Sequence, residues 1–204
     1  MISVYQLKSK FSDVLRPICN FLVKIGVTAN MVTVSAFLMS VVAGILVYIY
    51  EPKFPCAFWL LPVVLFVRMA LNNIDGVIAR EHNQKTNIGA IYNELGDILS
   101  DLAIYVPFLY VCNVDFWLIF LFAIFTIISE TVGIMGVQIN ASRRYDGPMG
   151  KSDRAFWLSL FAIVRYVHPL LLKSQNIFVG VVALLLVFTA FNRVAAALKE
   201  AKNK

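Results

Sequence analysis

Acidic side chains occupy two neighbouring apolar segments of the chain. Asp75 lies at the end of the first segment, and Glu94, Asp97 and Asp101 fall within eight residues of the second. A carboxylate inside a bilayer costs on the order of 2.5–3.5 kcal/mol, and several together repel one another unless a cation lies among them. Hard oxygen ligands of this kind suit Mg²⁺ or Mn²⁺ better than zinc. The leading interpretation is a site for one of these cations.

Helical spacing predicts that the two segments present these groups on facing surfaces. Steps of three and four residues define two polar faces, one with Asn72, Asp75 and Ala79, the other with Gly89, Asn93, Asp97 and Asp101. The connection between the segments is short, so the two faces can meet near the membrane surface. In the alternative interpretation, the acids line a polar crevice or pair with Arg68 and Arg80.

The composition indicates that lipid is the solvent for most of the chain. Of 204 residues, 60% are hydrophobic and 15% are charged, whereas a soluble domain is about 45–50% apolar and about 25% charged. These values exclude soluble globular, disordered and fibrous proteins. Six segments approach the roughly 20 apolar residues that a spanning helix needs. They predict an all-α polytopic membrane protein with six transmembrane helices, over 31–50, 54–71, 89–112, 116–138, 155–172 and 177–198.

The distribution of lysine and arginine predicts the orientation. Fourteen of the 18 lie on one side of the spans, two lie on the other, and Arg68 and Arg165 lie within spans. The positive-inside rule places both termini and the predicted site in the cytoplasm. The net charge of +6 therefore reflects topology, and we expect no nucleic-acid partner. Cys56 and Cys112 both fall near the outer face, where a disulfide is the less favoured alternative.

Residues 1–30 are predicted to form an amphipathic helix on the cytoplasmic surface of the bilayer, ahead of a transmembrane domain over residues 31–204. Apolar residues repeat at helical spacing from Val4 to Ile25, with charged residues between them. Pro17 is expected to kink or break this helix. The alternative is a helix that packs against protein.

Charged side chains within the spans are expected to pair. Glu130 and Arg165 lie at similar depth if each residue rises about 1.5 Å along its helix, so they are predicted to form a structural pair. Arg68 and Asp101 are also expected to pair.

An unbroken pattern of eight constrained positions runs from Asn72 to Asp97. It resembles the signature of the CDP-alcohol phosphotransferase family, D-x2-D-G-x2-A-R-x8-G-x3-D-x3-D. Six positions carry the expected residue, namely Asp75, Gly76, Ala79, Arg80, Gly89 and Asp97. The six predicted spans and the amphipathic N-terminus are also similar to the family, so the resemblance covers nearly the whole chain.

Asparagine stands at two positions where the signature has aspartate, Asn72 and Asn93. An amide oxygen still binds hard cations, but each replacement removes one negative charge. The loss weakens the case for the family's two-metal site, and Asp101 and Glu94 are the residues that can partly compensate. Paired asparagines resemble the YnbA-like bacterial inner-membrane branch of the family.

The resemblance implies metal-dependent transfer of a phosphatidyl group from CDP-diacylglycerol to the hydroxyl of a small alcohol, with release of CMP. Asp97 would be catalytic, as the general base. The ligands of Mg²⁺ or Mn²⁺ would be Asn72, Asp75, Asn93 and Asp97, with Asp101 one turn further. The nucleotide would lie against Gly76, Ala79, Arg80 and Gly89. Helix packing for the small residues, and an anchoring role for Arg80, are the alternatives.

Four basic residues, Arg143, Arg144, Lys151 and Arg154, lie in and beside one connection on the predicted cytoplasmic side. Gly150-Lys151 is similar to a Gly-Lys stretch that the family uses near phosphate groups. We expect these residues to bind phosphate, which would suit a phosphorylated acceptor. The alternative is that they only fix the topology.

Three functions are compatible with these patterns. The first is the enzyme, in a bacterial inner membrane, with membrane lipids and a second copy of the chain as partners implied by the resemblance. The second is a catalytically impaired relative that binds CDP-alcohol or lipid, because of Asn72 and Asn93. The third is an ion or solute transporter, since charges within spans also mark transport pathways.

Overall fold

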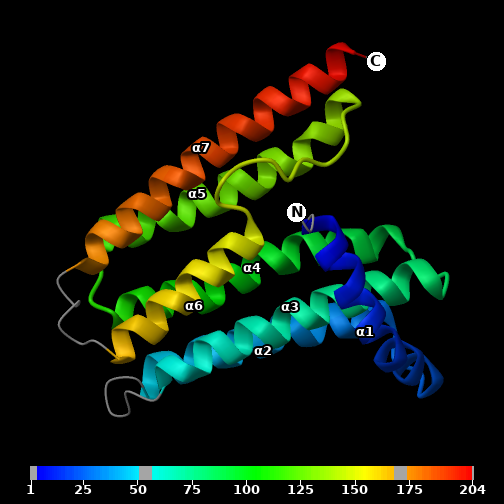
Figure 1. The fold of residues 1–204 in the computed structure, drawn as a ribbon, viewed down its shortest axis with the longest axis horizontal. Helices are drawn as coiled ribbons and strands as arrows, with labels where there is room; N and C mark the ends of the chain where they lie inside the picture. Colours follow the sequence, from blue (N-terminus) through cyan, green and yellow to red (C-terminus); the bar gives the residue numbers. More distant parts are fainter. Residues whose placement is uncertain (1–3, 51–56, 168–173, 204) are drawn as a thin grey trace.

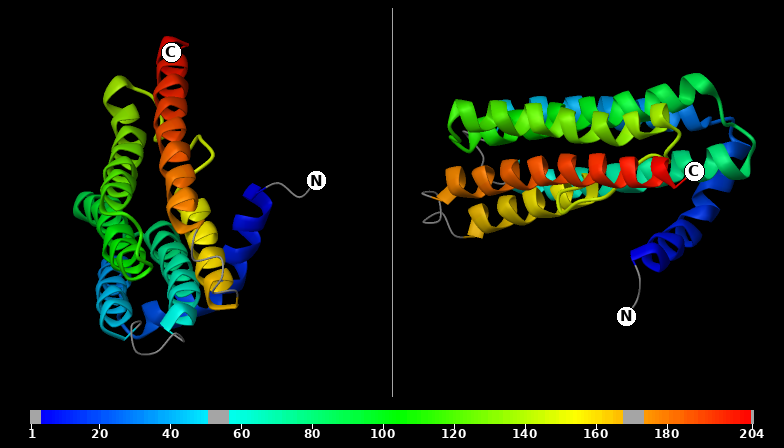
Figure 2. Two further views of the ribbon diagram at one scale, coloured as in Figure 1. Left: turned by 90° about the vertical axis from the view of Figure 1, so that its left-hand side faces the viewer. Right: turned by 90° about the horizontal axis from the view of Figure 1, so that it is seen from above.

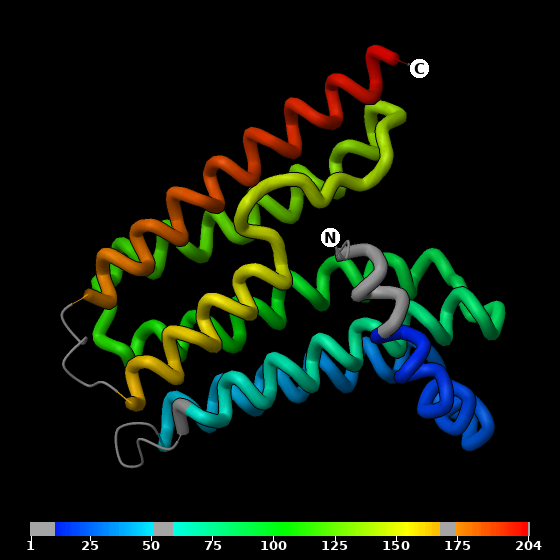
Figure 3. Tube along the Cα trace, viewed as in Figure 1, coloured from blue at the N-terminus to red at the C-terminus, as the bar shows by residue number. Residues whose placement is uncertain are grey.

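The computed structural model describes residues 4–50, 57–167 and 174–203, which form helices joined by short connections (Figures 1 and 3). The helices are α1 (Val4–Lys24), α2 (Ala29–Tyr50), α3 (Ala57–Glu81), α4 (Asn87–Val111), α5 (Phe116–Met135), α6 (Lys151–Val167) and α7 (Gln175–Lys202). A short 3-10 helix, η1 (Gly136–Ile139), extends α5. Within these described ranges there is no strand, which confirms the predicted all-α fold.

The helices α2 to α7 run roughly along one long direction, and α1 crosses one end of them (Figures 1 and 2). Helix α2 packs against both α3 and α4, α3 also packs against α6, and α5 packs against α4 and α7. The end crossed by α1 is the end at which α3 stops and α4 starts. The motif residues in the second half of α3 and the first half of α4 therefore lie at this end of the bundle.

Four helical stretches are long and apolar enough to cross a membrane, namely Ala29–Tyr50, Trp59–Glu81, Phe116–Ile139 and Gln175–Lys202. They correspond to the predicted first, second, fourth and sixth spans. Helix α4 carries three acidic residues, and α6 has only 17 residues. The described residues therefore contain four candidate membrane spans, while the count of six spans stays a prediction.

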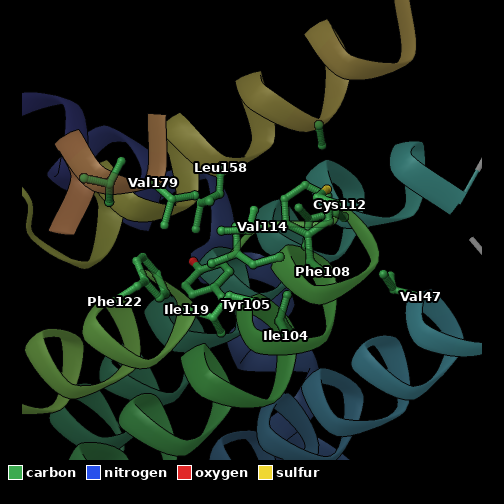
Figure 4. Packing of buried hydrophobic residues seen from close by; sticks show 14 of the residues in the cluster. Val47, Ile104, Tyr105, Phe108, Cys112, Val114, Ile119, Phe122, Leu158 and Val179 are labelled. Carbon is green, nitrogen blue, oxygen red and sulfur yellow. The ribbon is translucent and has the colours of Figure 1, made fainter. Parts of the chain in front are cut away.

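The apolar core draws buried residues from α2 and α3 and from four further helices, α4, α5, α6 and α7. Tyr105, Phe108, Phe122, Leu158 and Val179 come from these four helices and are at most 1% exposed (Figure 4). The rings of Tyr105 and Phe122 meet edge to face, with centroids 6.0 Å apart. The core thus ties α6, a short amphipathic helix, to the rest of the bundle.

Helix α1 packs one apolar face on α3. Leu15 and Cys19 are buried in a cluster with Val77 and Ile78 of α3, whereas Val14 on the other side is 72% exposed. The helix continues through its proline without interruption, so the predicted break does not occur. Packing on α3 supports part of the protein-contact alternative, and a position on the membrane surface stays a prediction.

The less favoured alternative, a disulfide between Cys56 and Cys112, is not tested, because Cys56 lies outside the described residues. Cys112 itself is buried in the apolar core.

Candidate active site

Helices α3 and α4 place the four motif positions against one another. Asn72 on α3 donates from Nδ2 to Oδ1 of Asp97 on α4, at 2.6 Å. Asn93 on α4 donates from Nδ2 to Oδ2 of Asp75 on α3, at 3.4 Å. The two amide groups therefore link the two carboxylates across the helices, as the spacing predicts. In these hydrogen bonds the amides act as donors, which leaves their oxygens available to a cation.

Asp75 is the motif residue best placed to bind a cation. It is only 3% exposed, and its Oδ2 accepts a hydrogen bond from Thr33 Oγ1 of α2 at 2.7 Å. Its Oδ1 is buried and has no hydrogen-bond partner within the described part of the chain. A buried carboxylate oxygen without a partner is costly, and a bound cation removes that cost.

The donor set around Asp75 fits one hard divalent cation. One carboxylate and the amide oxygens of Asn72 and Asn93 are the oxygen ligands that Mg²⁺ and Mn²⁺ take. Among the residues with described positions, no three His, Cys, Asp or Glu side chains converge as a metal-binding group. The two asparagines account for this, because they leave only two carboxylates at the four motif positions.

Asp97 is in contact with basic side chains from two other helices. The Nζ of Lys151, at the start of α6, contacts its Oδ2. Arg68 of α3 donates from Nη2 to the backbone carbonyl of Asp97 at 3.0 Å and lies 3.6 Å from Oδ1. The carboxylate is 9% exposed and is thus held in one orientation by α3, α4 and α6.

Asp101 belongs to a buried ion-pair network rather than to the cation site. Its Oδ1 lies 2.5 Å from Arg68 Nη1, which confirms the predicted pair, and its Oδ2 lies 2.6 Å from Arg154 Nη2. Asp101 is fully buried, and each of its oxygens is paired with an arginine. The structure therefore corrects the expectation that Asp101 binds metal.

Glu130 of α5 also joins this network, and its predicted pairing with Arg165 is wrong. Glu130 lies 2.9 Å from Arg154 and 3.3 Å from Arg193 of α7. The reason is the path of the connection between α5 and α6, which folds back into the bundle (Figure 1). Met149 in this connection is 1% exposed and donates from its backbone to Thr189 of α7. Helix α6 consequently starts at the depth of Glu130.

The structure separates the four basic residues predicted to bind phosphate. Only Lys151 reaches a motif carboxylate. Arg143 pairs with Glu94 at 2.5 Å and lies over the ring of Tyr145. Glu94 is therefore not available to compensate for the lost motif charges.

Arg144 and Arg154 are engaged by acids. Arg144 pairs with Asp146 at 2.8 Å and with Glu200 at 2.7 Å. Its hydrogen bonds to Asp146 hold the pKa of that carboxyl below its ordinary value. Arg154 is fully buried between Asp101 and Glu130. The structure thus corrects the expectation that Arg154 binds a phosphate group, because no part of it is accessible.

The small motif residues serve close packing in the structure. A Cβ added to Gly89 would lie 2.5 Å from Oδ1 of Asn30, so a larger residue here would force the Asn30 side chain on α2 to move. A Cβ on Gly76 would lie 3.0 Å from Nη1 of Arg80, which folds back over that glycine. Arg80 is exposed. These contacts support the packing alternative for Gly89 and leave the nucleotide-binding role of Gly76, Ala79 and Arg80 a prediction.

Two residues of the site were not found from the sequence. Thr33 holds Asp75, but it is one of several hydroxyl residues in α2 and nothing in its spacing marks it. Arg193 pairs with Glu130 and donates to the carbonyl of Ser129 at 2.5 Å. Its place in the last predicted span was a signal, because arginine is rare there, but its partner was not evident.

Comparison with known proteins agrees with this geometry. The chain is 42% identical to the inner membrane protein YnbA of Escherichia coli strain K12, over 192 residues that make up 94% of each chain. It is 30% identical to the phosphatidylinositol phosphate synthase of Mycobacterium marinum over 100 residues, which are 48% of this chain and 40% of that protein. The apolar helices and the inner-membrane relative indicate a bacterial integral membrane protein.

Solved structures share the fold. The phosphatidylinositol phosphate synthase of Mycobacterium tuberculosis matches with a TM-score of 0.73 in complex with manganese and citrate, and of 0.72 with CDP-DAG bound. Identity is 18% in both cases, and the matches cover 89% of this chain and 88% or 92% of those chains. The family model for CDP-alcohol phosphatidyltransferase matches residues 26–197. The chain therefore belongs to the CDP-alcohol phosphatidyltransferase family of enzymes.

Proposed function

We propose that this protein transfers a phosphatidyl group from CDP-diacylglycerol to the hydroxyl of a small alcohol, with a divalent cation, Mg²⁺ or Mn²⁺, and with release of CMP. The observation that carries the proposal is the pair Asp75 and Asp97, which face one another from α3 and α4 through Asn72 and Asn93. The mycobacterial synthase of the same fold has been crystallised with manganese and with CDP-DAG, which supports both the cation and the donor.

In the proposed reaction, one bond to phosphorus forms and another breaks. The acceptor oxygen forms a bond to the phosphorus that carries diacylglycerol, and the bond from that phosphorus to the bridging oxygen breaks. The bridging oxygen leaves with CMP, and the proton of the hydroxyl passes to the Asp97 carboxylate and then to water. A cation bound by Asp75, Asn72 and Asn93 would hold the pyrophosphate and offset its negative charge. Asp97, oriented by Arg68 and Lys151, is assigned the role of the base.

The nucleotide is proposed to lie at the cytoplasmic end of the bundle, against Gly76, Ala79 and Arg80. Arg143 and Arg144 flank this end but are paired with acids, so a phosphorylated acceptor would have to displace those pairs. Lys151 is the cation nearest to the carboxylates and the strongest candidate to contact a phosphate. We also propose that the protein is a homodimer in the bacterial inner membrane, with both termini in the cytoplasm.

The test is release of CMP from CDP-diacylglycerol by the purified full chain in detergent micelles. Phosphorylated and unphosphorylated polyols would be compared as acceptors, with Mg²⁺, Mn²⁺ or EDTA. We expect metal-dependent release with at least one acceptor, and loss of about 10²–10⁴-fold in Asp97→Asn, since general bases contribute that much. Asp13→Asn, on the exposed side of α1, is the matched control. No metal-dependent CMP with any acceptor would contradict the proposal.

A binding protein without turnover is the second candidate, favoured by the two asparagines and by the contact of Lys151 with Asp97. Its signature would be an increase in melting temperature with CDP-diacylglycerol and no CMP. The family assignment and the location of the carboxylates at one end of the bundle both argue against the transporter.

A further inference from the structure

The two carboxylates of the site have different electrostatic surroundings. Among the described residues, the side chains that donate hydrogen bonds to Asp75 are neutral, the Thr33 hydroxyl and the Asn93 amide, and its Oδ1 is buried without a partner. Asp97 contacts the Lys151 ammonium and lies 3.6 Å from the Arg68 guanidinium. Lys151 thus contacts Asp97 directly, whereas it acts on Asp75 only through space.

The charge balance decides how many divalent cations this site can hold. With Asn72 and Asn93 neutral, the motif carries two negative charges in all. Lys151 offsets the charge at Asp97, which leaves the charge at Asp75 for one divalent cation. A second one at Asp97 would lie beside Lys151, with only one carboxylate oxygen between the two positive charges, and their repulsion opposes binding.

The Lys151 ammonium occupies the position at Asp97 where a second divalent cation would bind. Lys151 begins α6, and its side chain is 30% exposed, so part of the side chain is open to solvent. The start of α6 is fixed by Arg154, whose guanidinium is buried between Asp101 and Glu130. Gly150 precedes Lys151 and donates its backbone N–H to Asp153 at 3.0 Å, which also fixes this turn. The ammonium is therefore held at Asp97 by a rigid support.

We propose that this chain binds a single divalent cation, at Asp75, and that the Lys151 ammonium at Asp97 takes the place of a second one. In the reaction, Lys151 would offset the negative charge that develops on the transferred phosphate while it keeps Asp97 oriented toward the acceptor hydroxyl. This inference rests on the proposed function, but its main readout is cation binding, which is measured without any turnover.

The first experiment counts bound Mn²⁺ by electron paramagnetic resonance during titration of the purified full chain. We expect one Mn²⁺ per chain, lost in Asp75→Asn. In Lys151→Gln we expect Mn²⁺ to bind about tenfold more tightly, because a like charge close to the cation is removed. Lys202→Gln, at the exposed end of α7, is the matched control and should leave Mn²⁺ affinity unchanged. Two Mn²⁺ per unaltered chain, or weaker binding in Lys151→Gln, would overturn the proposal.

A second set of variants tests the exchange of a lysine for a metal ion. The triple variant Asn72→Asp, Asn93→Asp, Lys151→Gln should bind two Mn²⁺ per chain, and Lys151→Arg should still bind one. A count of one in the triple variant, with a native melting temperature, would contradict the proposal.

Turnover gives an independent readout. Lys151→Gln should release CMP about 10²-fold more slowly, as expected when a group that stabilises the transition state is lost, although it binds Mn²⁺ more tightly. Lys151→Arg should restore most of the rate. If the unaltered chain released no CMP, the proposed function would fail, while the Mn²⁺ count would still decide this inference.

Discussion

Arg154, at the start of α6, and Asp101, in the middle of α4, form an ion pair inside the bundle. Nη2 of the arginine lies 2.6 Å from Oδ2 of the aspartate, and Nε lies 3.0 Å from the same oxygen. Both side chains are fully buried, and Arg68 pairs with the other aspartate oxygen. Because these three residues come from three helices, the pair fixes α6, and with it Lys151, relative to the motif.

Asp101→Asn should therefore destabilise the fold. Removing one partner of a buried ion pair costs about 3–5 kcal/mol, since the other charges stay buried without compensation. The measurement is thermal unfolding of the purified protein in micelles, with Asp13→Asn as the surface control. By contrast, Asp75→Asn should lose Mn²⁺ binding with little loss of stability. If Asp101→Asn kept its stability but lost Mn²⁺, Asp101 would be a metal ligand after all.

Glu130→Gln tests whether that acid is structural. Glu130 pairs with Arg154 and Arg193, so its loss should lower the free energy of unfolding by an amount similar to that in Asp101→Asn. CMP release per folded molecule should stay close to that of the unaltered chain. Intact folding together with lost turnover would show instead that Glu130 takes part in the reaction.

Glu200 anchors the connection that precedes α6. It accepts hydrogen bonds from the backbone and hydroxyl of Ser142, at 3.0 and 2.7 Å, and from Arg144 at 2.7 Å. Glu200→Gln should accelerate tryptic cleavage after Arg143 and Arg144 about tenfold, because hydrogen bonds to charged groups contribute about 1.5–3 kcal/mol each. Glu81→Gln, which breaks an exposed pair with α1, is the control. Equal cleavage rates in the two variants would contradict an anchoring role.

The close approach of α2 and α4 depends on Gly44. A Cβ at this position would overlap the backbone carbonyl oxygen of Ala103. Gly44→Ala should lower the free energy of unfolding by about 1–3 kcal/mol, as overpacking does. Gly96→Ala is the matched control, since its Cβ would meet only a Thr33 methyl group at 3.8 Å. A stable Gly44→Ala protein would mean that α2 and α4 lie further apart.

Cys19 reports on the packing of α1 against α3. Its thiol is fully buried, and burial raises the thiol pKa above the ordinary value. Because the thiolate is the reactive form, maleimide labelling of Cys19 at neutral pH should be at least about tenfold slower than that of an introduced Asp13→Cys thiol. Labelling should increase only as pH rises above the ordinary thiol pKa. Mass spectrometry locates the label, and equal rates would show that α1 detaches from α3.

The sequence by itself determined that the chain is helical and that the two halves of the motif face one another. Spacing along a helix fixes which side chains share a face, so Asn72 and Asp75 of α3 and Asn93 and Asp97 of α4 were predicted to meet. The same reasoning predicted the pair of Arg68 with Asp101, because both lie a similar distance beyond the motif on adjacent helices.

Only the tertiary structure decided the partners that come from further along the chain. Arg154, rather than Arg165, pairs with Glu130, because the connection before α6 folds back into the bundle and shifts that helix in depth. Periodicity within a helix carries no information on such a shift. In the same packing, both oxygens of Asp101 pair with arginines rather than with a metal ion. It also places Lys151 in contact with Asp97. The sequence thus predicted where the acidic residues lie, and the tertiary structure determined which arginine or lysine pairs with each of them.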